Sequence, residues 1–403
     1  MNTPVKNINL KNSALLFFAG VFFFFLTRQV PFSGFSIIMN LFLLLIYFVY
    51  FLPIVNNIYQ GPSYFRVLLF LLTGLLVFDL FYSICLMNDV VKNIRFFILL
   101  ILLIYSFYLV PPERLLKIFI AIMLLQAIVI ILFSIYLSVF FDLTSYMPIR
   151  FFFLEKEWGD VYTYNGWLFI VQIKGNALLP LTLFITYFYP IKRKYLIRGI
   201  LLIACVVAGN FAYVISMALF YMVYFLRSET AKELIRKIVL LLMTVFVLSI
   251  PVYTYYVKPV LEGKQEGSLS TRADQTALLM DDLTQNAGTF LLGTGLGHTV
   301  ERATYARDYR GDVYFELQVL YVLNQLGVIG FILVFLYVIV LMPLYKFRNK
   351  WLLFIYVCYV IYACTNPYIF DSNQIAVILV LNALQNFYDR NPSFQKWSTL
   401  GTA

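Results

Sequence analysis

The side chains best able to do chemistry gather in one polar stretch in the last third of the chain. Four arginines lie in this stretch, and a glutamate, Glu316, follows them at the start of an apolar run. Guanidinium groups are permanently charged and bind phosphate oxygens through paired hydrogen bonds, so the pattern favours a site for a lipid pyrophosphate, both as ligand and as leaving group. A solvated basic face is the simpler alternative. The arginines are Arg272, Arg302, Arg307 and Arg310.

Glu316 is the best candidate for a general base. Helical spacing predicts that Asp312, Glu316 and Leu320 share one face of a helix, with Asn324 a further turn along. A carboxylate that is partly shielded from water suits proton abstraction near neutral pH. An acidic group near a helix N-terminus is also favoured by the helix dipole alone, so a structural role stays open.

Two further motifs lie between the arginines. Gly293, Gly295 and Gly297 lack the spacing and the βαβ context of a nucleotide-binding loop, so they predict a tight turn with close backbone contact. His298 and Glu301 have no further ligands at metal-binding spacing. We therefore expect no metal and no cofactor, and we interpret His298 as a structural or substrate-binding residue.

The elements that must position these residues are membrane-spanning helices. The chain has 403 residues and is 62% hydrophobic and 12% charged, whereas soluble proteins contain about 25% charged residues. A soluble enzyme or a DNA-binding protein is therefore excluded. The net charge of +10 lies in short loops between apolar runs, as in a basic polytopic membrane protein, so we expect no nucleic-acid partner. The four cysteines lie in apolar stretches and are interpreted as small buried residues.

Apolar runs of about 20 residues predict about twelve transmembrane helices in an all-α fold. The run 199–226 has basic loops on both sides, so it must leave and return as two short helices that turn at Gly209-Asn210. Both termini are then cytoplasmic, and most of the 30 Lys and Arg residues lie inside. The other expected spans are 13–27, 35–55, 67–87, 96–110, 118–141, 166–189, 238–257, 313–344, 351–371 and 373–388.

The chain then divides into three parts. Residues 1–257 form an N-terminal transmembrane bundle with an aromatic and acidic external loop at 142–165. Residues 258–312 form one large external loop, with helical spacing from Arg272 to Leu283, and 313–403 form the C-terminal helices. Charges inside spans are functional candidates by default, although pairing between spans is an alternative. These charges are Lys174, Asp79 and Asp371.

The stretch 270–331 resembles the bacterial O-antigen polymerase and O-antigen ligase superfamily. It contains Ser270-Thr271-Arg272, then Phe290-Leu-Leu-Gly-Thr-Gly-Leu-Gly297, and then Glu316-Leu-Gln-Val-Leu-Tyr-Val-Leu-Asn-Gln-Leu-Gly327 with Gly330. In the ligases a histidine usually stands eleven residues before the Gly of the Leu-Gly pair, and here that position is Glu316. This departure favours the polymerase. The resemblance implies a GT-C-like glycosyltransferase of the bacterial inner membrane with a large periplasmic loop.

The resemblance also implies a reaction of lipopolysaccharide biosynthesis. A glycan on undecaprenyl pyrophosphate is transferred to the non-reducing-end sugar of a second lipid-linked repeat unit, with Glu316 as base and Arg272 at the departing pyrophosphate. A chain-length regulator and a flippase are the implied protein partners, beside membrane lipids. An O-antigen ligase that passes glycan to lipid A core, or a transporter of lipid-linked oligosaccharides, are the alternatives. The implied substrate-binding residues are Arg302, Arg307, Arg310, His298, Lys174, Asp312 and Tyr309.

Overall fold

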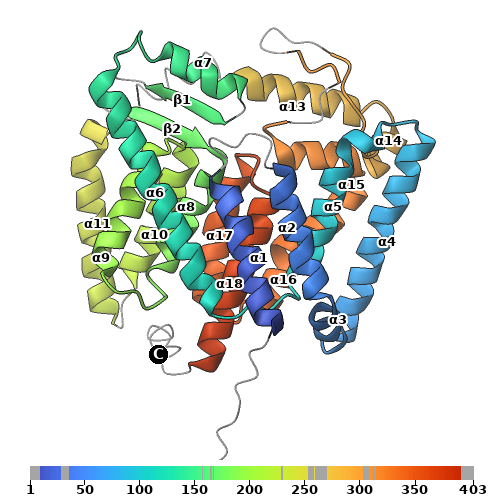
Figure 1. The fold of residues 1–403 in the computed structure, drawn as a ribbon, viewed down its shortest axis with the longest axis horizontal. Helices are drawn as coiled ribbons and strands as arrows, with labels where there is room; N and C mark the ends of the chain where they lie inside the picture. The colour runs from blue at the N-terminus through green and yellow to red at the C-terminus, as the bar shows by residue number, and fades with distance from the viewer. Residues whose placement is uncertain are drawn as a thin grey trace, which may run out of the picture.

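The computed structural model is a helical bundle with a two-stranded sheet at one end (Figure 1). We call this end the loop end, because α7 (Met147–Glu155), β1 (Gly159–Thr163), α13 (Ser270–Leu283) and α14 (Ala287–Leu292) lie there. The structure describes residues 10–28, 36–156, 158–163, 166, 168–227, 230–252, 258, 270–302, 308–311 and 315–391.

Long apolar helices mark the chain as a helical membrane protein. Within the described residues, 4 helices are long and apolar enough to cross a membrane, or up to 5 if a bent pair counts as one span. Fewer described helices than the expected twelve are long and apolar enough to span a membrane, so the number of twelve spans stays a prediction. The four are α1 (Leu10–Thr27), α4 (Ser63–Cys85), α6 (Arg114–Phe140) and the continuous run Gln318–Lys346.

The bent pair occupies the span expected at 35–55. It consists of α2 (Ser36–Val49) and α3 (Phe51–Tyr59), which meet at 55°. Pro53 gives the physical reason, because it has no N–H to donate to the Val49 carbonyl and its ring clashes with that group. The predicted single helix is therefore two.

The hairpin expected within 199–226 is confirmed. Helices α9 (Lys194–Val207) and α10 (Phe211–Leu226) turn at Gly209, whose φ is +65°. A Cβ there would lie 2.2 Å from Ile170 Cγ2, so glycine is needed for space as well as for conformation. The Asn210 side chain accepts a hydrogen bond from the Ala212 N–H at 3.0 Å and caps α10.

The single helical span expected at 166–189 is wrong. The chain first forms β2 (Phe169–Ile173), antiparallel to β1, then a 3-10 helix η1 (Lys174–Leu178), and only then α8 (Leu179–Ile185). The polar backbone groups of this irregular segment are buried and hydrogen-bonded. Ser134 Oγ donates to the Phe169 carbonyl at 2.6 Å, and Asn176 Nδ2 donates to the Val171 carbonyl at 2.7 Å.

Helix α18 (Ser372–Arg390) forms part of the core of the bundle. It is buried at every position from Ser372 to Gln385, as expected of a helix enclosed by others. Asn382 Nδ2 donates to the Ser106 and Leu109 carbonyls at 3.2 and 2.9 Å, so its buried amide is paired. The remaining helices are α5 (Val90–Ser106), α11 (Ala231–Val252), α15 (Gln318–Phe335), α16 (Met342–Lys346) and α17 (Lys350–Cys364), with a π-helix η4 (Leu336–Leu341) between α15 and α16.

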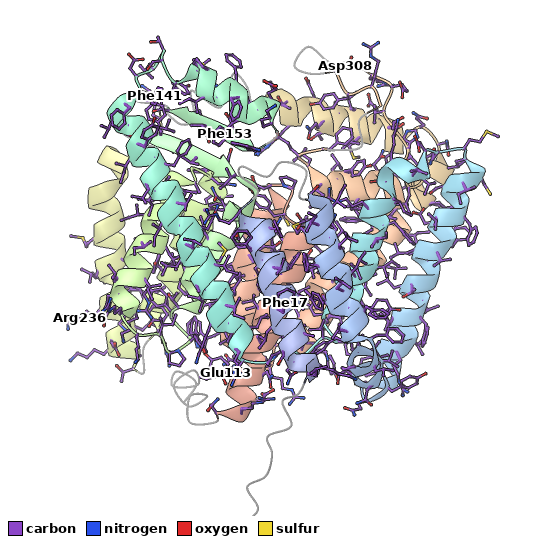
Figure 2. All side chains as sticks on the ribbon, viewed as in Figure 1. Phe17, Glu113, Phe141, Phe153, Arg236 and Asp308 are labelled. Carbon is purple, nitrogen blue, oxygen red and sulfur yellow. The ribbon has the colours of Figure 1, made fainter. Side chains whose placement is uncertain are left out.

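The loops predicted for opposite sides of the membrane lie at opposite ends of the bundle. Figure 2 shows Phe141, Phe153 and Asp308 at the loop end, and Glu113 and Arg236 at the other end. Which end faces the cytoplasm stays a prediction.

Candidate functional site

Helix α13 is fixed against the start of α15 at the loop end. A small apolar cluster joins the two, and within it the rings of Tyr309, Phe315 and Tyr321 stack in sequence with centroids 5.6 and 5.2 Å apart. Gln275 of α13 adds a polar link, because its Oε1 accepts the Leu317 N–H at 3.2 Å. The helix expected from Arg272 to Leu283 is confirmed, and its inner face positions the candidate residues.

The structure brings the two predicted catalytic residues together. Arg272 Nε lies 3.6 Å from Glu316 Oε2, and the two side chains are 32% and 41% exposed. Arg272 Nε makes no hydrogen bond in the described part of the chain, so the contact is an ion pair without a short hydrogen bond. A permanent cation and a carboxylate, both partly exposed, therefore share one position at the loop end.

The predicted helical face of Glu316 is wrong. Glu316 precedes α15, which begins at Gln318, so Glu316 does not share a helical face with Leu320 and Asn324. The bond from the Leu317 N–H to Gln275 holds this segment against α13 before the helix starts. Asp312 lies outside the described residues.

Asp282, His298 and Asn324 form a second polar group. Asp282 Oδ2 lies 3.0 Å from His298 Nε2 and accepts a hydrogen bond from Asn324 Nδ2 at 3.0 Å. Burial alone would raise the pKa of Asp282, but the hydrogen bonds from His298 and Asn324 outweigh it and hold the pKa below its usual range. Asp282 was not predicted as a site residue, although its spacing from Arg272, Gln275 and Leu279 places all four on one face of α13.

The glycine run forms a tight turn, as predicted. Gly293, Gly295 and Gly297 have φ values of +85°, +84° and +81°. A Cβ on Gly293 would lie 2.2 Å from the Gln325 carbonyl, and one on Gly297 would lie 2.4 Å from the Asp89 carbonyl. The turn is therefore packed between the loop-end segments of α5 and α15.

The backbone donors of this turn are already used. The six consecutive N–H groups of residues 293–298 all donate within the protein, for example from Leu296 to Ser83 Oγ at 2.6 Å and from Gly297 to Gln325 Oε1 at 2.9 Å. A phosphate cradle needs such groups to be unpaired. The turn holds the site together and does not bind phosphate through its amides.

The remaining predicted residues that the structure describes make contacts of their own, and the Tyr309 N–H donates to the Arg302 carbonyl at 3.1 Å. Arg302 pairs with Asp281 at 3.2 Å, and Arg310 pairs with Asp308 at 2.7 Å. The hydrogen bonds from Arg310 lower the pKa of Asp308 to about 2. Tyr309 is buried in the aromatic stack, Lys174 begins η1, and Arg307 lies outside the described residues.

The two carboxylates that were predicted inside spans, Asp79 and Asp371, differ in their surroundings. Asp371 caps α18 by accepting the Asn373 and Gln374 N–H groups, which is a structural role. Arg95 of α5, which the sequence reasoning did not single out, interacts electrostatically with Asp371. Asp79 is buried in α4, and its Oδ2 has no hydrogen bond among the described residues.

The chain was compared with known protein families, curated proteins and solved structures. No family model, curated protein or solved structure matches the chain. Among the described residues there is no group of three or more His, Cys, Asp or Glu side chains able to hold a metal ion. The class that the fold defines is therefore a helical membrane protein, with a charged and polar site at its loop end.

Proposed function

We propose that this protein is a metal-independent glycosyltransferase of the bacterial inner membrane that joins undecaprenyl-pyrophosphate-linked repeat units, as an O-antigen polymerase does. The observation that carries the proposal is the ion pair of Arg272 and Glu316, 3.6 Å apart and partly exposed at the loop end. One group suits a departing pyrophosphate, and the other suits an attacking hydroxyl.

The ion pair gives a simple order of events. A bound pyrophosphate carries more charge than one carboxylate, so it draws the Arg272 guanidinium away and frees Glu316. Glu316 then takes the proton of the acceptor hydroxyl as its oxygen attacks the anomeric carbon. The bond from that carbon to the phosphate oxygen breaks, and the pyrophosphate leaves with the electron pair. Arg272 stabilises the charge that develops on it, through a transition state of oxocarbenium character.

Side chains must supply the positive charge, because the turn amides of residues 293–298 are used. Arg310 can contribute after exchanging Asp308 for phosphate, since an exposed ion pair contributes little to stability. Arg302 keeps its pair with Asp281 and is assigned to the glycan. Arg307, Lys174 and Asp312 keep their predicted substrate-binding roles as part of the proposal.

The test uses the full chain reconstituted in lipid nanodiscs. We expect it to convert synthetic undecaprenyl-pyrophosphate-linked repeat units into a ladder of longer lipid-linked chains, without added metal or nucleotide sugar. A ligase would instead consume donor only when lipid A core is added. A transporter in liposomes would move the substrate across the bilayer without a new glycosidic bond. Either of these results, or no ladder, contradicts the proposal.

A further inference from the structure

An open pocket of about 240 Å³ lies beside the Asp282–His298 contact. Leu278 and Val300 give it an apolar surface, and both belong to the cluster that joins α13 to α15. Asp282, Gln285, His298 and Thr299 supply polar atoms around this surface. Sites for drug-sized ligands span roughly 300–1,000 Å³, so this pocket suits a single small ring.

The polar side chains of the pocket are held in place before any ligand binds. Asp282 Oδ2 is held by His298 and Asn324, and Asp282 Oδ1 accepts a hydrogen bond from Gln285 Nε2 at 3.0 Å. Thr299 Oγ1 donates to Glu301 Oε1 at 3.0 Å. Fixed donors and acceptors beside an apolar surface match a pyranose ring, which has hydroxyl groups at its edge and C–H groups on its faces.

Charge excludes an anionic ligand from the pocket. Two carboxylates, Asp282 and Glu301, line it, and the cation that lines it, Arg302, is paired with Asp281 outside it. A pyrophosphate or a uronate would meet this negative charge. An uncharged sugar meets only hydrogen-bonding groups.

We infer that this pocket binds an uncharged pyranose of the glycan, away from the reacting atoms. Asp282 lies ten residues after Arg272 on α13, so the pocket and the ion pair are roughly 15 Å apart along the helix axis, at 1.5 Å of rise per residue. A sugar held there positions the rest of its chain at Arg272 and Glu316, and selects the repeat unit. The choice of a sugar as ligand rests on the proposed function.

Saturation-transfer NMR on the full chain in nanodiscs tests this inference without any turnover. The probes are uncharged methyl pyranosides at millimolar concentration, with methyl glucuronide and inorganic pyrophosphate as charged comparisons. We expect at least one uncharged pyranoside to bind saturably and neither anion to displace it. Gln285→Trp fills the pocket and His298→Ala removes a wall, so each should weaken binding about tenfold or more.

Thr284→Trp is the matched control, because Thr284 is exposed and adjacent to Gln285 but does not line the pocket. It should leave binding unchanged, as should Glu316→Ala at the ion pair. The inference is overturned if no uncharged pyranoside saturates, if Gln285→Trp binds like the wild type, or if pyrophosphate displaces the sugar. Sugar binding without chain extension would instead contradict only the proposed function.

Discussion

Replacing Glu316 by Gln separates a catalytic carboxylate from a structural one. The amide keeps the size of the side chain and its place beside Arg272, but it can no longer take a proton. If the Arg272–Glu316 contact served stability alone, the variant would show mainly a lower unfolding temperature. If Glu316 is the base, chain extension falls while the fold is kept.

The expected loss of stability and the expected loss of rate can both be estimated. Two unit charges 3.6 Å apart interact by about 1 kcal/mol in a water-like dielectric. Because the side chains are 32% and 41% exposed, the net loss of stability should be roughly 0–1 kcal/mol. Loss of a general base lowers the rate by about 10²- to 10⁴-fold. The rate effect should therefore be far larger than the stability effect.

The assay compares chain extension in nanodiscs with thermal unfolding of the same preparations in detergent. Arg272→Ala should also abolish extension, and Arg272→Lys should restore little of it, because an ammonium group cannot bind the pyrophosphate bidentately. Lys92→Ala is the matched control, since the Lys92–Asp89 pair has a similar separation of 3.7 Å and exposures of 49% and 50%. Near-normal extension by Glu316→Gln would refute the assignment of the base.

Three further predictions concern the loop end. Gly297→Ala should destabilise the protein by about 2 kcal/mol or more, seen as a lower unfolding temperature, because its φ is +81° and a Cβ would lie 2.4 Å from a backbone carbonyl. The pKa of Asp282 in the folded protein is below its usual range, so the stabilising contribution of the Asp282 carboxylate is complete above pH ~3.9. This contribution is lost as the pH falls toward the pKa of the folded state. An acid-unfolding series should show the loss in the wild type and not in Asp282→Asn. A membrane-impermeant maleimide should label the exposed Cys85 from the periplasmic side only, and should leave the buried Cys205 and Cys358 unlabelled until unfolding, as mass spectrometry can show; labelling of Cys85 from the cytoplasm would invert the proposed topology.

Several elements could be predicted because their signals are local. The turn at Gly209-Asn210 follows from basic loops on both sides of one apolar run. The α13 helix follows from its spacing of apolar and acidic residues. The glycine turn follows from a run of residues that readily adopt positive φ. Each of these patterns can be recognised in one continuous stretch of sequence.

Other features depend on contacts that no local pattern contains. Hydropathy cannot separate a buried strand from a buried helix, so the segment 166–189 was predicted as one span although it contains β2. Glu316 was placed on a helix because its spacing fits one, but Gln275 binds the backbone of the next residue and the helix starts later. The Asp282–His298 contact joins residues whose separate patterns indicate no pairing.

Composition and charge pattern alone determine that this chain belongs in a membrane, that it is helical, and that its loops separate into two groups. These properties depend on the hydrophobicity and charge of each residue, which do not depend on how the chain folds. Only the tertiary structure decides that Arg272 meets Glu316, that the turn amides are all used, and that Asp282 joins His298 beside a pocket. These are pairings between groups distant along the chain, and they depend on how α13 packs against α15, which no single stretch of sequence encodes.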